Sequence, residues 1–268
     1  MLFISIITHI IIFFVISPVW AESTNLKTKE GKQFPVQFSV SQTNSAPTAL
    51  YISGLGGKGN QVSSISKFFN RNGINLVTFD RNEKKCKGFA CFKTVGQRSK
   101  SGQLIYAENN QETAIEHILK NEITSVLNFI IASNWYDGSQ GIYIIGGSFG
   151  SWLTLAVMSN PTLRENVKGV VFLSPSVAPH KSSGKYAKEL DKFKYLKSSN
   201  QSSKCFGIGS PNDILFPGAT TKDAVDFLND NLSCDTFKKL IVKSKLHSHK
   251  LLVKEKNIQT QIVSWIIN

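Results

Sequence analysis

Short apolar runs alternate with stretches of helical hydrophobic spacing along most of this chain. Residues 64–71, 112–133, 152–158, 219–232 and 257–267 have the apolar spacing of helices. The runs that indicate strands lie at residues 32–40, 48–53, 74–79, 141–145, 167–174, 204–209 and 237–242. Alternating strands and helices predict an α/β fold, a mostly parallel twisted sheet with helices on both faces.

The N-terminal segment differs from the rest. Residues 1–20 contain no Lys, Arg, Asp or Glu, and small residues, Val19 and Ala21, follow Pro18 just before the polar chain begins. This pattern predicts a secretory signal peptide over residues 1–21 and a secreted or periplasmic protein. The alternative is an uncleaved membrane anchor, because the apolar run approaches the roughly 18 residues that a span needs.

Residues 22–268 form one predicted domain, because their length suits a single large α/β unit and no linker or repeat interrupts them. The segment 180–203 is rich in Ser and Lys and is the candidate insertion or small lid. Oligomeric state is left open.

The chain has 4 cysteines. Export would place them in an oxidising compartment, where disulfides form. Cys86 with Cys91 and Cys205 with Cys234 are the pairs favoured by proximity and predicted topology. A metal site is disfavoured because no His or further Cys stands at ligand spacing beside them, and no cofactor is expected.

The formal net charge is +13 and comes mostly from scattered lysines. Such a surface is typical of a solvated face with loose attraction to anionic lipid or polymer, and it carries no nucleic-acid recognition pattern.

The strongest chemical signal is the G-x-S-x-G sequence of residues 146–150, which follows a predicted buried strand and opens a predicted helix. A turn this tight would lift the hydroxyl of Ser148 out at the carboxyl edge of the sheet, and Gly146 and Gly150 would avoid Cβ collisions there. Ser148 is therefore the candidate nucleophile, and an inert glycine-rich turn is the alternative.

A serine hydroxyl needs a base and an acid that orients the base. Asp213 lies after the predicted strand 204–209, and two histidines, His247 and His249, follow the next strand. We favour His249 as the base because an apolar pair soon follows it, with His247 as the alternative. His117 and His180 are interpreted as structural or exposed.

These motifs together resemble the α/β-hydrolase superfamily. The glycine-rich residues 54–57, the turn 146–150, Asp213 with Pro217, and His249 occur in the superfamily's order over nearly all of the mature chain. The short glycine-rich loop and the lack of a large cap are most similar to small dienelactone-hydrolase-like and esterase-like members. The resemblance implies an oxyanion hole formed by the backbone amides of Leu55 and Phe149.

The leading functional hypothesis is a secreted serine hydrolase that cleaves an ester, thioester or amide of a small acyl substrate through an acyl-enzyme. Two alternatives remain: a binding protein that keeps the fold without the activity, and an acyltransferase that uses the same three residues.

Overall fold

The computed structural model describes residues 22–54, 58–81, 97–98, 104–105, 115–177, 203–216 and 219–268. Its centre is an eight-stranded sheet with the order β1-β2-β4-β3-β7-β8-β9-β12. The strands are β1 (Glu22–Lys27), β2 (Gln33–Ser39), β3 (Thr48–Ile52), β4 (Asn75–Phe79), β7 (Ile142–Gly147), β8 (Val167–Leu173), β9 (Lys204–Gly209) and β12 (Thr236–Ile241).

The pairing is parallel from β4 through to β12 and antiparallel only at β1 and β2. Because parallel strands run the same way, their carboxyl ends meet at one edge of the sheet, and the loops that leave this edge lie close together. The predicted fold class, a mostly parallel sheet with helices on both faces, is confirmed.

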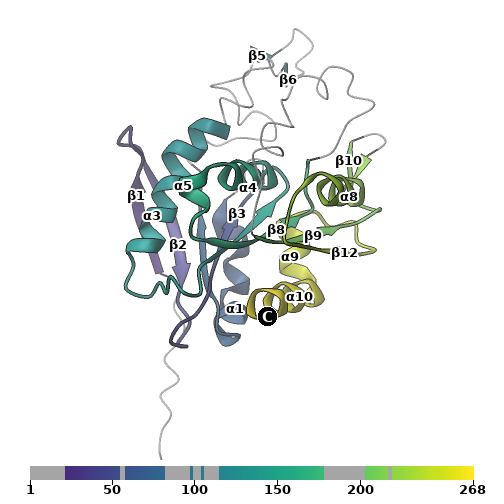
Figure 1. The fold of residues 1–268 in the computed structure, drawn as a ribbon. Helices are drawn as coiled ribbons and strands as arrows, with labels where there is room; N and C mark the ends of the chain where they lie inside the picture. The colour runs from purple at the N-terminus through teal and green to yellow at the C-terminus, as the bar shows by residue number, and fades with distance from the viewer. Residues whose placement is uncertain are drawn as a thin grey trace, which may run out of the picture.

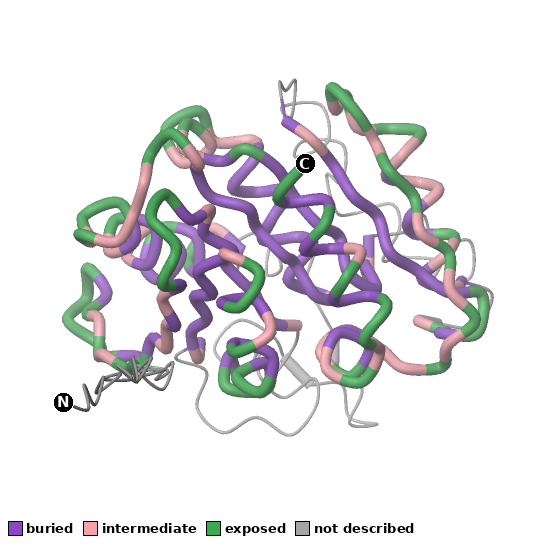
Figure 2. The backbone as a smooth tube through the Cα atoms, turned by 90° about the horizontal axis from the view of Figure 1, so that it is seen from below, coloured by how far each residue is buried: buried purple, intermediate pink, exposed green. Residues whose placement is uncertain are grey.

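Each central strand sends alternate side chains to two separate cores. In β3, Leu50 and Ile52 belong to one apolar cluster, and Ala49 and Tyr51 belong to the other. The same division holds in β7 and β8. Strands buried on both faces read as continuous apolar runs, and this explains why the sequence indicated them clearly. Figure 2 shows the buried strands at the centre of the molecule and exposed chain around them.

Helices cover both faces of the sheet (Figure 1). The first cluster is closed by α3 (Thr124–Ala132), α4 (Gly150–Ser159) and α8 (Thr221–Asn231), with the π-helical segment η3 (Leu119–Ile123) before α3. The second is closed by the 3-10 segment η1 (Gly59–Ile65), α1 (Ser66–Arg71), α9 (His249–Lys254) and α10 (Lys256–Ile267). The short helix α5 (Pro161–Arg164) follows α4.

Smaller elements complete the described chain. The strands β10 (Ile214–Phe216) and β11 (Ala219–Thr220) pair with each other, as do β5 (Gln97–Arg98) and β6 (Leu104–Ile105).

Among the elements that the sequence did not predict, β1 and α9 have a clear physical reason. β1 was missed because its side chains are exposed or partly exposed and give no buried run. The loop expected around His249 is in fact the first turn of helix α9, which is only six residues long and so too short for a clear periodic signal.

A disulfide joins Cys205 in β9 to Cys234, just before β12, with the two Cα atoms 6.0 Å apart. This pairing was predicted and is confirmed. The other predicted pair, Cys86 with Cys91, lies outside the described residues, as do the predicted signal peptide and all of the candidate lid except Ser203. Within the described chain, every helix is too short or too polar to cross a membrane.

Candidate active site

Ser148 stands in the tight turn between β7 and α4. Its φ angle is 53°, in the left-handed region that side chains other than glycine rarely adopt. The surroundings hold this conformation: the Ser148 N–H donates to the Leu173 carbonyl at 3.0 Å, and the Ser151 N–H donates to the Ser148 carbonyl at 3.0 Å. The strained backbone holds Ser148 half-exposed between two buried neighbours.

Glycine is required at the turn by close approach of the chain. A Cβ added to Gly150 would lie 2.1 Å from the carbonyl oxygen of Ile52, and one added to Gly146 would lie 2.3 Å from Thr154 Oγ1. Helix α4 therefore packs closely on its own strand β7, as the sequence predicted for a turn of this kind, and also directly on the end of β3.

Asp213 and a histidine form a hydrogen-bonded pair at the same edge. Asp213 follows β9, and His247 follows the adjacent strand β12. The His247 Nδ1 lies 2.8 Å from Asp213 Oδ2 and 3.1 Å from Oδ1. Because an ionised carboxylate only accepts, Nδ1 carries the proton and Nε2 is left as the basic nitrogen. The Asp213 side chain is 5% exposed, and that of His247 is 37% exposed.

This pairing favours the alternative candidate, His247, over the sequence-based preference for His249. Asp213 bonds to the alternative candidate, His247, whereas His249 is the first residue of α9. Partial burial, followed by the nearby charges of Lys250 and His247, lowers the pKa of His249 below its ordinary value of 6.5. The two histidines are only two residues apart, and the sequence offered no local signal for which imidazole would reach Asp213.

The residue next to the serine contacts the residue next to the paired histidine. A Cβ on Gly147 would lie 2.4 Å from Ser248 Oγ, so β7 and the loop after β12 are in close contact beside Ser148 and His247. Ser248 is buried, has a φ of 50°, and lies with its Oγ 3.4 Å from the hydroxyl of Tyr51. Burial raises the pKa of Tyr51 to about 12, so this hydroxyl stays protonated and keeps its hydrogen bond.

The end of β3 lies against the nucleophile. A Cβ on Gly54 would lie 3.0 Å from Ser148 Cβ. The buried Arg81 donates a hydrogen bond from its guanidinium to the Gly54 carbonyl, and its guanidinium carbon lies 5.6 Å from the centre of the Phe149 ring. Arg81 therefore contacts both the residue before Leu55 and the side chain of Phe149. Leu55 and Phe149 are the residues expected to supply the oxyanion amides. Leu55 itself lies outside the described residues, as does Pro217.

Sequence reasoning did not assign a role to Arg81, Tyr51 or Ser248. The position of Arg81 two residues after a buried strand was the available signal, since charged residues just past the carboxyl end of a parallel strand lie at this edge. Ser248 and Tyr51 gave no signal, because their contact joins segments distant in sequence.

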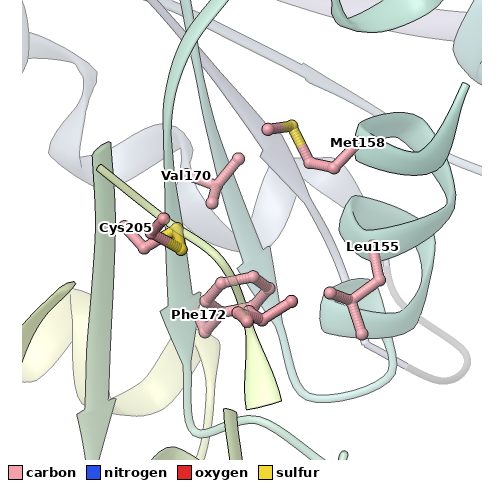
Figure 3. A pocket seen from close by; sticks show the side chains of 7 residues that line it. Leu155, Met158, Val170, Phe172 and Cys205 are labelled. Atoms are coloured by element: carbon pink, nitrogen blue, oxygen red, sulfur yellow. A yellow bond between two sulfur atoms is a disulfide. The ribbon is translucent and has the colours of Figure 1, made fainter. Parts of the chain in front are cut away.

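A separate cavity lies beside the disulfide (Figure 3). The space open to a water-sized molecule there is about 10 Å³. Its lining is apolar or sulfur-containing: Leu155, Met158, Val170, Phe172, Cys205, Leu232 and Cys234. It is too small for a substrate and holds no reactive pair, so the candidate chemistry lies at the carboxyl edge of the sheet. Among the described residues, no cluster of His, Cys, Asp and Glu could hold a metal ion.

Solved structures with the same fold are numerous. An S-formylglutathione hydrolase from Staphylococcus aureus superposes with a TM-score of 0.63 at 12% identity, over 93% of this chain and 99% of that one. An S-formylglutathione hydrolase from Agrobacterium tumefaciens gives 0.60 at 12% identity, over 92% and 95% of the two chains. An esterase from an Arctic intertidal metagenomic library gives 0.56 at 12% identity, over 91% of each chain.

These likenesses show that the chain has the α/β-hydrolase fold, which confirms the fold expected from its motifs. At such low identity they show the fold alone. No protein-family model matches the chain, and no curated protein matches it either.

Proposed function

We propose that this protein is a serine hydrolase that cleaves esters, with thioesters or amides as related substrates. Ser148 is the nucleophile, His247 is the general base and Asp213 orients the base. The single observation that carries the proposal is the 2.8 Å contact between His247 and Asp213 at the sheet edge where Ser148 occupies a strained turn.

The chemistry follows from this arrangement. His247 Nε2 takes the proton of the Ser148 hydroxyl while Oγ attacks the substrate carbonyl and its C=O π electrons move to oxygen. The tetrahedral intermediate expels the alcohol, which takes the proton from the imidazolium, and an acyl-enzyme remains. Water then repeats the attack with the same base, releases the acid and restores Ser148. Asp213 fixes the tautomer of the neutral imidazole and stabilises the imidazolium that forms.

The negative oxygen of the tetrahedral intermediate needs donors, and the backbone amides of Phe149 and Leu55 are our proposal for them. The N-terminal end of helix α4, where Phe149 stands, favours negative charge. The hydrogen bond from Arg81 to the Gly54 carbonyl supports the proposal, because it fixes the chain just before Leu55.

The comparisons support hydrolysis in general terms, since the similar structures include esterases and S-formylglutathione hydrolases.

We further propose a secreted or periplasmic protein with residues 1–21 as its signal peptide. N-terminal sequencing of the exported protein tests this proposal. The disulfide between Cys205 and Cys234 is compatible with that location. Loose attraction of the lysine-rich surface to anionic surfaces remains part of the proposal.

A fluorophosphonate probe tests the proposed function. Wild type should be labelled at one site and should hydrolyse short-chain p-nitrophenyl esters, and Ser148→Ala should do neither. The control is Ser159→Ala at the far end of helix α4, where the hydroxyl only donates to the Ala156 carbonyl at 2.9 Å. This control should react like wild type.

Three other results would change the assignment. A folded wild type that is neither labelled nor active indicates the alternative function, a binding protein that keeps the fold without the activity. Labelled protein that passes the acyl group to an added alcohol in preference to water indicates an acyltransferase. Labelling of Ser148→Ala equal to that of wild type contradicts the assignment of Ser148 as the nucleophile.

A further inference from the structure

The loops that carry the acid and the base are joined by a second connection besides the pair that they form. Asp213 lies in the loop after β9, and His247 lies in the loop after β12. Ser210, the first residue after β9, is fully buried between these two loops.

The hydroxyl of Ser210 bonds to both loops. It donates to the Ser244 carbonyl at 2.6 Å and accepts the Ser244 N–H at 3.2 Å. It also accepts the Asn212 N–H at 3.0 Å. One hydroxyl group thus joins the backbone just before the acid to the backbone three residues before the base.

Thr221 fixes Ser210 and the acid from the other side. The Ser210 N–H donates to Thr221 Oγ1 at 2.8 Å, and that hydroxyl donates to the Ser210 carbonyl at 3.2 Å. The Thr221 N–H in turn donates to the Asp213 carbonyl at 2.9 Å. Thr221 is also fully buried, so these bonds are shielded from water.

The connection continues to the base. The Leu246 N–H donates to Ser244 Oγ at 3.2 Å, and Leu246 directly precedes His247. The hydrogen bonds therefore run from the Asp213 backbone through Thr221, Ser210 and Ser244 to the residue before His247. The contact between the Asp213 and His247 side chains closes this route into a ring.

We propose that Ser210 is a positioning residue that holds the acid loop and the base loop in register. This inference rests on the proposed function, because it assigns Ser210 a role in keeping the His247 imidazole aligned for proton transfer. Without the hydroxyl, the partly buried N–H and carbonyl of Ser244 lose their partner, and the two loops can shift apart. A misplacement of about 1 Å in a catalytic group costs on the order of 10²-fold in rate.

The test is Ser210→Ala. We expect kcat per probe-titrated active site to fall about 10- to 100-fold, with KM changing less than about threefold because substrate contacts stay in place. Amide hydrogen exchange should accelerate together in residues 212–213 and 244–247. A role in stability alone would lower the melting temperature without changing kcat per active site.

The matched control is Ser41→Ala, at the opposite edge of the sheet. The Ser41 hydroxyl also donates to a carbonyl, that of Asn70 at 3.1 Å, and accepts an N–H, that of Thr43 at 3.1 Å. Its loss should cost a similar free energy of unfolding, about 1–2 kcal/mol, and should leave kcat within twofold of wild type.

Thr221→Val gives a second route if Ser210→Ala does not fold. It removes the hydroxyl that holds Ser210 while keeping the side-chain shape, and the same fall in kcat and the same joint increase in exchange are expected.

The proposal is overturned if the folded variants keep kcat within twofold of wild type, or if only one loop exchanges faster. Those results leave the proposed function intact, since wild type would still be labelled at Ser148. A wild type that is neither labelled nor active overturns both proposals.

Discussion

The two halves of the candidate site are held in place by different physical means. The nucleophile turn, residues 146–150, requires glycines without a Cβ: a Cβ at Gly150 would lie 2.1 Å from the Ile52 carbonyl oxygen. The acid-base corner, residues 210–213 and 244–249, is shaped by hydrogen bonds such as that from Ser210 Oγ to the Ser244 carbonyl at 2.6 Å. Steric exclusion fixes the first and polar bonding fixes the second.

This difference explains what each half tolerates. The glycines of the turn are a local sequence pattern, and any atom added at their close contacts must displace backbone. The corner depends on segments 34 residues apart, and its bonds can loosen one at a time. We therefore expect large effects from small additions at the turn and graded effects from deletions at the corner.

The largest expected effect is at the paired histidine. His247→Ala should lower kcat by at least about 10³-fold, because it removes the base that Asp213 orients. His249→Ala should change kcat less than about tenfold, because its imidazole is not the one bonded to the acid. Steady-state kinetics on both purified variants check this, and a severe loss in His249→Ala with a mild one in His247→Ala would reverse the assignment.

The disulfide supports the acid-base corner through β9. Its two cysteines are 29 residues apart in sequence, and a closed loop of this size is worth about 3–4 kcal/mol in the chain-entropy account. Urea unfolding of the double variant Cys205→Ala/Cys234→Ala should show that loss relative to oxidised wild type. Equal midpoints and slopes for the two proteins would mean that the bridge is absent or without consequence.

At the nucleophile turn, Gly150→Ala should lower the free energy of unfolding by about 1–3 kcal/mol, because the added methyl forces α4 away from β3. It should also lower activity more than tenfold through displacement of Ser148. The control is Gly138→Ala, where the added Cβ meets only Tyr136 Cε1, at 3.8 Å. Thermal melts should separate the two variants, and a Gly150→Ala protein as stable and active as the control would contradict the steric account.

The smallest effect is a pH dependence at His249. Burial, followed by the charges of Lys250 and His247, lowers its pKa in the folded state, so the unfolded chain binds a proton more readily. Stability is therefore lost as the pH falls from the unfolded value of about 6.5 towards the folded value. His249→Gln should flatten the change in unfolding free energy between pH 7.5 and pH 5 by less than about 1 kcal/mol. Parallel curves for the two proteins would contradict this.

The contrast also explains how much the sequence could predict. The central strands and the nucleophile turn were predictable because buried runs and the Gly146 to Gly150 spacing are local patterns. Asp213 was placed correctly after β9 by the order of strands. The sequence favoured His249, whereas Asp213 contacts His247, because this geometry depends on the short helix α9 and on the close approach of Ser248 to Gly147.

Other parts of the site needed three-dimensional information altogether. The Ser210 hydroxyl looks like any serine in the sequence, and its role emerges only from the approach of the Ser244 backbone. Arg81 reaches the Gly54 carbonyl across 27 residues of sequence separation.

The central claim is that Ser148, His247 and Asp213 act together at one edge of the sheet. A crystal structure of the protein after reaction with a fluorophosphonate tests it most directly. We predict phosphorus bonded to Ser148 Oγ, its oxygen facing the Phe149 amide, and His247 Nε2 beside the adduct with Nδ1 still on Asp213. An adduct on another residue, or one approached by His249 with His247 turned away, would contradict the account.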